Sequence, residues 1–220
     1  MKLIVEYDQN QNSLPSGFVN AINYVVNYYD TVFTANVTVT IDVGYGEIDG
    51  QRLESDALGE SEQINVNPVS YSAVRNALIA ENAPGSSTLP AQPPPGNPGV
   101  LYMASSEEKA LGLIGNNNNI DGYAGFDSTP GTFSYAINSA PPGNQYYFVG
   151  VVEHEFSEIM GRTSYLNYTG TYSLMDLFRY SGPNSRQFTT GAASYFSINN
   201  GATNLDNWNN FRTGNNGDLG

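Results

Sequence analysis

The sequence predicts a mixed α+β fold, and three observations lead to that class. Residues 3–7 and 37–43 alternate in the way that is typical of β-strands, and the second segment is rich in β-branched side chains. Residues 16–33 repeat apolar side chains at steps of three and four, which predicts an amphipathic helix. Later candidate strands and helices are short and separated by loops. We therefore expect a mixed sheet with two or three backing helices.

The first 43 residues have the order strand, helix, strand. A loop and helix of this length most simply connect two parallel strands through a right-handed crossover. Glycines at positions 44 and 46 end the second strand. The opening of the chain therefore predicts a βαβ unit.

The middle of the chain is less regular. A strand near residues 64–66 and a helix near residues 71–81 are expected, followed by a loop over residues 83–99, which contain six prolines. A capping-box pattern at residues 105–108 predicts a helix that continues to residue 113. Residues 123–126 and 133–137 are strand candidates. These segments predict an α+β domain without an internal repeat.

Composition excludes several classes of function. The chain has 220 residues, enough for one domain with its own core. Its 8 basic and 21 acidic residues give a net charge of −13, which repels phosphate backbones and anionic lipids, so we expect neither nucleic acid nor a membrane as a partner. The chain has no cysteine and one histidine. Disulfide scaffolds, thiolate metal sites, cysteine nucleophiles and multi-histidine sites are therefore excluded.

The same composition predicts an extracellular location. Only 13% of the residues are charged, while 16 are tyrosines, which suits an acidic secreted bacterial protein. Residues 1–7 lack the apolar region of a signal peptide. We therefore expect the signal to have been removed or to lie outside this chain, which leaves open that the chain is a fragment of a longer secreted protein.

One segment, residues 147–162, carries the clearest chemical signal and contains the single histidine. At 100° per residue, it predicts a helix with an apolar stripe of Phe148, Val152, Phe156 and Ile159. A neighbouring face gathers His154, Glu155, Glu158 and Arg162. Two ligand side chains at positions i and i+4 of a helix can reach one metal ion, and the residue after the histidine then lies beside the metal-bound water.

This segment resembles the active-site helix of the zincin metallopeptidases, His-Glu-x-x-His, with Glu158 in place of the second histidine. The resemblance extends to the longer metzincin pattern, since Gly161 stands at its glycine position. Ser164 occupies the position of the third histidine, which is a departure from the pattern. Residues 172–176 resemble the methionine turn that underlies the metal in metzincins.

The chain also resembles a poorly characterised set of bacterial metalloproteases with the variant motif His-Glu-x-x-Glu-x-Met-Gly-Arg. Residues 154–162, 175–180 and 195–201 have counterparts in that set. The resemblance implies a single zincin-like catalytic domain over residues 1–220. Residues 1–160 would form the half with the twisted sheet and the active-site helix, and residues 161–220 an irregular C-terminal half.

The resemblance further implies a zinc-dependent metallopeptidase that hydrolyses protein or peptide substrates. His154 and Glu158 would bind Zn²⁺, and Glu155 would act as general base on the metal-activated water. Asp176, which follows the methionine turn, is the first candidate for a third ligand, with Ser164, Tyr165 or a water as alternatives. A histidine with several oxygen ligands also suits manganese, iron or, less well, calcium.

Other interpretations of the same residues remain open. His154 can hydrogen-bond a carboxylate in a purely structural role, with Glu158 paired to Arg162 one turn on. Asp176 can be a capping carboxylate or a partner of Arg179. In that case the alternative function is a catalytically inactive zincin-like module for extracellular adhesion or carbohydrate binding, in which exposed tyrosines would stack on sugars.

Overall fold

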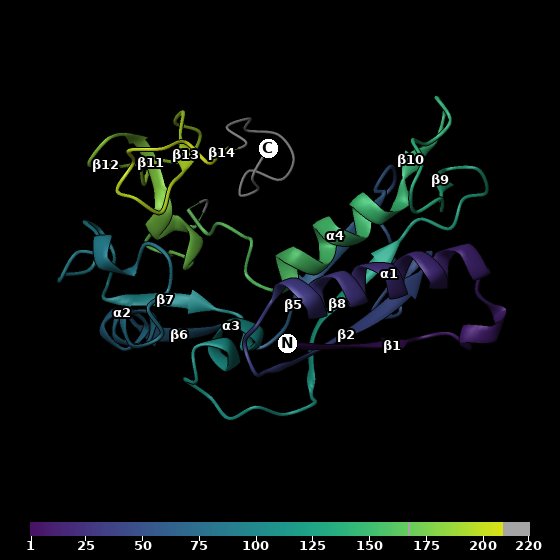
Figure 1. Ribbon diagram of the computed structural model, residues 1–220, viewed down its shortest axis with the longest axis horizontal. Coiled ribbons are helices and arrows are strands. Elements are labelled where there is room, and N and C mark those ends of the chain that lie inside the picture. Colours follow the sequence, from purple (N-terminus) through teal and green to yellow (C-terminus); the bar gives the residue numbers. More distant parts are fainter. Residues whose placement is uncertain (167, 209–220) are drawn as a thin grey trace. The chain divides into compact units, whose positions relative to one another are not determined.

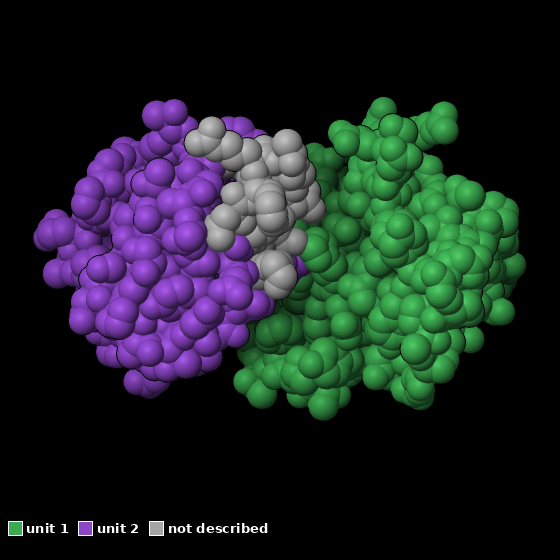
Figure 2. All heavy atoms as spheres, turned by 90° about the horizontal axis from the view of Figure 1, so that it is seen from above, with its two compact units in different colours: residues 1–65, 116–160 green, residues 66–115, 161–220 purple. Residues whose placement is uncertain are grey.

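The computed structural model describes residues 1–166 and 168–208 and has a mixed α+β fold, as predicted. In these residues it contains four α-helices and several small sheets. The chain divides into two compact units, each built from two segments (Figure 2). Unit 1 comprises residues 1–65 and 116–160, and unit 2 comprises residues 66–115 and 161–220.

This division differs from the two halves expected from the sequence. The expected boundary between residues 160 and 161 coincides with a boundary between the units. Residues 66–115, however, pack with the C-terminal segment instead of with the N-terminal half. The interpretation that both units form a single catalytic domain stays a prediction.

Unit 1 is built on a four-stranded sheet in the order β1-β2-β8-β5. Its strands are β1 (Lys2–Tyr7), β2 (Thr38–Tyr45), β8 (Ile120–Phe126) and β5 (Gly59–Gln63). The first three strands are parallel to one another, and β5 lies antiparallel to β8 at the edge of the sheet. The predicted βαβ opening is therefore confirmed, since β1 and β2 pair in parallel and a helix connects them.

Two helices pack on this sheet: α1 (Ser16–Val32) and α4 (Phe148–Ile159). Both lie on one face of the sheet in Figure 1. Their apolar stripes meet at Phe18 and Phe148, whose ring centroids are 5.0 Å apart, and Phe126 of β8 lies 5.2 Å from Phe148. No helix in the described residues has the combination of length and hydrophobicity needed to cross a bilayer.

Unit 1 also contains small accessory elements. They are the 3-10 turn η1 (Gln11–Ser13), the hairpin β3 (Glu47–Ile48) and β4 (Gln51–Arg52), and the parallel pair β9 (Phe133–Ser134) and β10 (Tyr146–Tyr147). The strand predicted over residues 133–137 is thus limited to its first two residues. Only these two pair with β10, and the residues beyond them have no ladder partner in the described chain.

Unit 2 combines short helices with two sheets. An antiparallel pair, β6 (Asn67–Ser70) and β7 (Val100–Met103), is accompanied by α2 (Tyr71–Ala80), α3 (Ser105–Ala110) and the 3-10 turn η2 (Ser86–Thr88). The turn η3 (Met175–Phe178) precedes a second sheet, in the order β12 (Ser185–Arg186), β11 (Arg179–Gly182), β13 (Tyr195–Phe196) and β14 (Asp206–Asn207). The predicted helix near residues 71–81 is confirmed, and Ser70 caps it by accepting a hydrogen bond from the Ala73 amide.

Two sequence predictions in this region are wrong. The strand expected at residues 64–66 falls in the gap between β5 and β6, because Asn65 adopts a positive φ of 52° that interrupts an extended chain. The helix expected to reach residue 113 ends at Ala110, and Gly112 follows with φ 64°. Its cap also lies one residue earlier than expected, since the Glu107 carboxylate accepts a hydrogen bond from the amide of Ala104.

Candidate metal centre

The helix α4 presents the predicted motif because its apolar stripe is completely buried. Phe148, Val152, Phe156 and Ile159 all have 0% exposure. Their burial against the sheet sets the rotation of the helix about its axis. The flank that carries His154, Glu155 and Glu158 is then held along the border between core and surface. The predicted helix and its buried stripe are confirmed.

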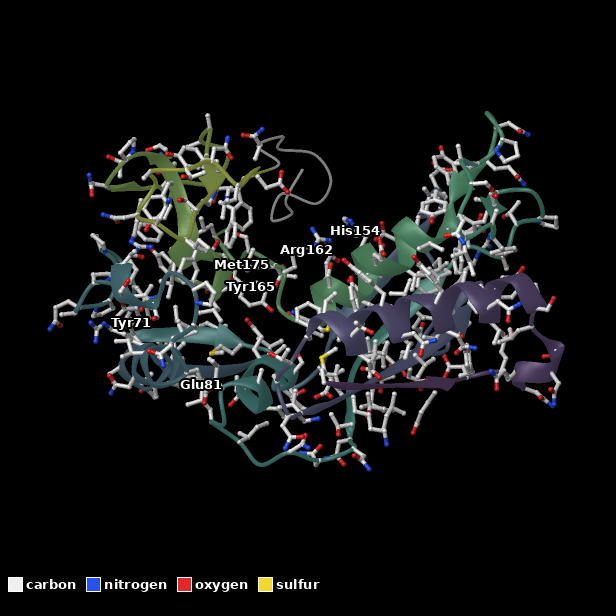
Figure 3. All side chains as sticks on the ribbon, in the orientation of Figure 1. Tyr71, Glu81, His154, Arg162, Tyr165 and Met175 are labelled. Carbon is white, nitrogen blue, oxygen red and sulfur yellow. The ribbon has the colours of Figure 1, made fainter. Side chains whose placement is uncertain are left out.

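The three predicted residues of α4 come together. One ligand atom from each of His154, Glu155 and Glu158 lies within 4.8 Å of the others, and no other such group of histidine, aspartate or glutamate occurs in the described residues. His154 Nε2 is 3.4 Å from Glu158 Oε1. The side chain of His154, labelled in Figure 3, is 35% exposed and that of Glu158 is 14% exposed, whereas Glu155 is buried at 6%. The group is thus open to solvent on the side of His154.

The edge strand β5 lies directly against this group. Ser61 Oγ donates a hydrogen bond of 2.5 Å to Glu158 Oε2, and Gln63 Nε2 donates one of 2.5 Å to the Glu158 carbonyl oxygen. Gly59 lies beside Glu155, and a Cβ atom at position 59 would be 2.7 Å from Glu155 Oε1. Alternate residues of one strand therefore contact both carboxylates of the motif.

Sequence reasoning missed these β5 residues. Residues 59–63 read Gly-Glu-Ser-Glu-Gln and have no alternation of apolar and polar side chains. Their strand conformation comes from antiparallel pairing with β8, more than 55 residues later in the chain. No local signal in this segment could have identified Ser61 as a neighbour of Glu158.

A cavity of about 480 Å³ opens beside the motif. Its lining is mainly apolar and comprises Leu58, Gly59, Tyr146, Tyr147, Gly150 and Val151, together with His154 and Glu155. A second, more polar cavity of about 590 Å³ shares Leu58 and Tyr146 with the first. The motif therefore borders a space that can accept an apolar side chain.

Asp176, the candidate third ligand, is a fully buried residue of unit 2. Its carboxylate accepts hydrogen bonds from the Ser164 hydroxyl, from the Tyr165 amide, and from both the amide and hydroxyl of Ser173. Burial raises the pKa of the Asp176 carboxyl, and these hydrogen bonds oppose that shift. These hydrogen bonds connect Asp176 to the loop that precedes η3, and Leu174, not Asp176, is the N-cap of that turn.

Ser164, the alternative third ligand, is one of these partners of Asp176. Neither residue belongs to the group formed on α4. Met175, at the segment that resembles a methionine turn, is half-buried at the start of η3 (Figure 3). The ligand role of Asp176 and the supporting role of Met175 stay predictions.

Arg179 is not an exposed partner for a carboxylate. It is 2% exposed and donates to the Ser194 hydroxyl and to the carbonyl oxygens of Thr189 and Ala192. Its guanidinium also lies 5.4 Å from the ring centroid of Trp208. Burial lowers the pKa of Arg179, and the charge of Asp176 partly offsets this effect. These contacts make Arg179 an organising residue of the second sheet of unit 2.

Comparison with known proteins finds no match to this chain. No protein-family model matches the chain, and no curated protein or solved structure is significantly similar to it.

Proposed function

We propose that this protein is a zinc-dependent metallopeptidase with a zincin-like fold. The observation that carries the proposal is the convergence of His154, Glu155 and Glu158 on one flank of α4, beside an open cavity. Three ionisable side chains gathered on one flank of a helix, with Glu155 buried and Glu158 only 14% exposed, are costly to desolvate unless they bind or react. The antiparallel edge strand along this helix and the mixed sheet beneath it support the zincin-like interpretation.

The residues present fit a zinc ion. An imidazole and a carboxylate are ligand types that zinc accepts, and two ligand atoms at about 2.0–2.1 Å from a tetrahedral zinc are about 3.3 Å apart. The separation of 3.4 Å between His154 Nε2 and Glu158 Oε1 agrees with that value. His154 and Glu158 would hold the ion. For the two other positions of a four-coordinate ion, the sequence offers Asp176, Ser164, Tyr165 or water, and these assignments stay predictions.

Zinc, when bound, would supply a Lewis acid that polarises the substrate carbonyl and makes water a stronger nucleophile near neutral pH. The chain's own residues perform the proton transfers. Glu155 would accept the proton of the attacking water and then donate it to the leaving amine of the cleaved peptide. Its burial at 6% limits the rotamers available to the side chain, so the carboxylate is positioned before the substrate arrives.

The substrate would be a protein or peptide with an apolar side chain next to the cleaved bond. The mainly apolar cavity beside His154 and Glu155 supports this substrate class. Secretion is proposed from the composition, which is low in charged residues and rich in tyrosine, and the net charge of −13 supports the absence of a nucleic-acid partner.

The test combines metal content with hydrolysis. Protein purified without chelators or affinity nickel should contain about one zinc per chain by plasma mass spectrometry, and His154→Ala should lose it. Glu155→Gln should retain zinc and lose hydrolysis of a casein or a quenched peptide library. Glu153→Gln is the matched control, since it makes the same chemical change one residue before His154 and should retain both properties.

Each outcome decides between functions. If neither the wild type nor His154→Ala binds zinc after incubation with it, the proposal is wrong and a non-catalytic adhesion or carbohydrate-binding module becomes the better hypothesis. If Glu155→Gln still hydrolyses the peptides at the wild-type rate, the role of Glu155 is wrong even when zinc is bound.

A further inference from the structure

We infer that Ser61 is a positioning residue for Glu158, and that its hydroxyl sets the orientation in which this carboxylate can bind a metal ion. The inference rests on the proposed function, because it concerns the same site. Ser61 belongs to the edge strand β5 and lies 97 positions before Glu158 in the sequence. It is polar, small and outside the motif that the sequence identifies.

The two oxygens of the Glu158 carboxylate have different partners. Oε2 accepts the hydrogen bond from Ser61 Oγ at 2.5 Å, whereas Oε1 faces His154 Nε2 at 3.4 Å. Rotation of the carboxylate that broke the first contact would also move Oε1 away from the imidazole. The serine hydroxyl therefore selects the rotamer in which Glu158 and His154 point to one position.

The same strand also forms a hydrogen bond with the backbone of Glu158. Gln63, two residues after Ser61 and on the same face of β5, donates to the Glu158 carbonyl oxygen. Gly59, two residues before Ser61, allows the strand to approach Glu155 closely. One face of β5 thus lies against both carboxylates of the motif, and its hydrogen bond to Glu158 is of the kind that orients metal-binding side chains.

Fixing the side chain has an energetic consequence for metal binding. The Glu158 side chain is 14% exposed, and loss of the hydrogen bond would remove one of the contacts that hold its rotamer. Ordering a glutamate side chain costs conformational entropy, which a metal ion would otherwise have to offset on binding. Removal of such an outer hydrogen bond typically lowers metal affinity about 10- to 100-fold.

The strand itself does not depend on the hydroxyl. Ser61 pairs through its backbone with Ala124 of β8, within an antiparallel ladder of five residue pairs. Ser61→Ala should therefore leave the fold intact. Two further variants, Ser61→Thr and Ser61→Val, have side chains of equal shape that differ in the hydroxyl. Comparing them tests the role of the hydroxyl even if the alanine variant is unstable.

The experiment measures the affinity for Zn²⁺ by chelator competition and the visible absorption spectrum of the Co²⁺-loaded protein. Ser61→Ala and Ser61→Val should bind Zn²⁺ about 10- to 100-fold more weakly than the wild type and show an altered Co²⁺ spectrum. Ser61→Thr should restore both properties. Ser13→Ala is the control, since it removes a hydroxyl that donates to the Asn10 carbonyl within its own turn.

The outcomes separate this inference from the proposed function. If the wild type binds metal and both Ser61→Ala and Ser61→Val bind it within twofold of the wild type, the role of Ser61 is wrong and the metal centre stands. If the wild type binds neither Zn²⁺ nor Co²⁺, the proposed function and this inference fail together.

Discussion

Replacing Glu107 with glutamine should remove much of the pH dependence of stability in unit 2. Glu107 lies in α3, is 8% exposed, and accepts a hydrogen bond of 2.9 Å from the Ala104 amide. Burial, with smaller contributions from the charges of Glu108 and Asp176, raises the pKa of its carboxyl from 4.5 to about 8, although the hydrogen bond from Ala104 opposes the shift. Glutamine has nearly the same shape and can accept the same hydrogen bond, but it cannot ionise.

The direction in which stability changes with pH follows from the number of protons that the folded and unfolded states bind. Between its unfolded pKa of 4.5 and its folded pKa of about 8, Glu107 holds its proton in the native state and loses it in the unfolded state. The free energy of unfolding therefore falls as pH rises through this window. One pKa unit corresponds to 1.36 kcal/mol, so the shift amounts to a loss on the order of 5 kcal/mol. Domains are typically stable by about 5–15 kcal/mol, which makes a loss of this size measurable.

The assay is urea unfolding at a series of pH values from 4.5 to 9, followed by tryptophan fluorescence. Trp208 is the single tryptophan of the chain, is 3% exposed and belongs to unit 2, so its emission reports on that unit. The difference in unfolding free energy between Glu107→Gln and the wild type should grow in favour of the variant as pH rises. Glu81→Gln, which removes an exposed carboxylate after α2, corrects for net charge.

Parallel pH profiles for Glu107→Gln and the wild type would refute the reasoning. They would mean that Glu107 ionises equally easily in the folded and unfolded states, so that its buried position imposes no electrostatic cost. A variant that lost stability relative to the wild type with rising pH would reverse the predicted sign.

Three further substitutions test the packing within the two units. Gly59→Ala should lower kcat for peptide hydrolysis about 100-fold, because the added Cβ would lie 2.7 Å from Glu155 Oε1 and would displace this carboxylate. The affinity for Zn²⁺ should change less than kcat, because Glu155 is not a proposed ligand. Gly161→Ala should cost at least about 1–3 kcal/mol in urea unfolding, since φ is +106° and the new Cβ would be 2.5 Å from Glu107 Cδ. Phe156→Ala should cost about 3–5 kcal/mol by circular dichroism, because its ring is completely buried. Unchanged kinetics in the first variant, or unchanged stability in the other two, would contradict these assignments.

The sequence predicts best where the signal is local and periodic. The helix around His154 could be identified because four apolar residues at steps of three and four define its buried side. The same periodicity places Glu155 and Glu158 next to the histidine before any partner is known. The opening βαβ unit is predicted for the same reason.

The predictions fail where conformation depends on a distant partner or on one backbone angle. Asn65 lies between Ile64 and Val66, which resemble a strand, yet its positive φ breaks the extended chain. The helix that starts at Ser105 stops at Ala110 although a longer one was expected, and the turn at Gly112 follows. Neither angle leaves a pattern in hydrophobicity.

The sequence by itself determined which residues of α4 share a face, because a helix converts spacing along the chain into spatial proximity without help from other segments. Only the tertiary structure decided what supports that face. The polar strand β5 has no periodicity of its own, and it reaches Glu155 and Glu158 because backbone pairing with β8 holds it at the edge of the sheet. Segment 66–115 likewise packs with residues after 160, since the burial of side chains depends on contacts between segments far apart in the chain and not on local sequence.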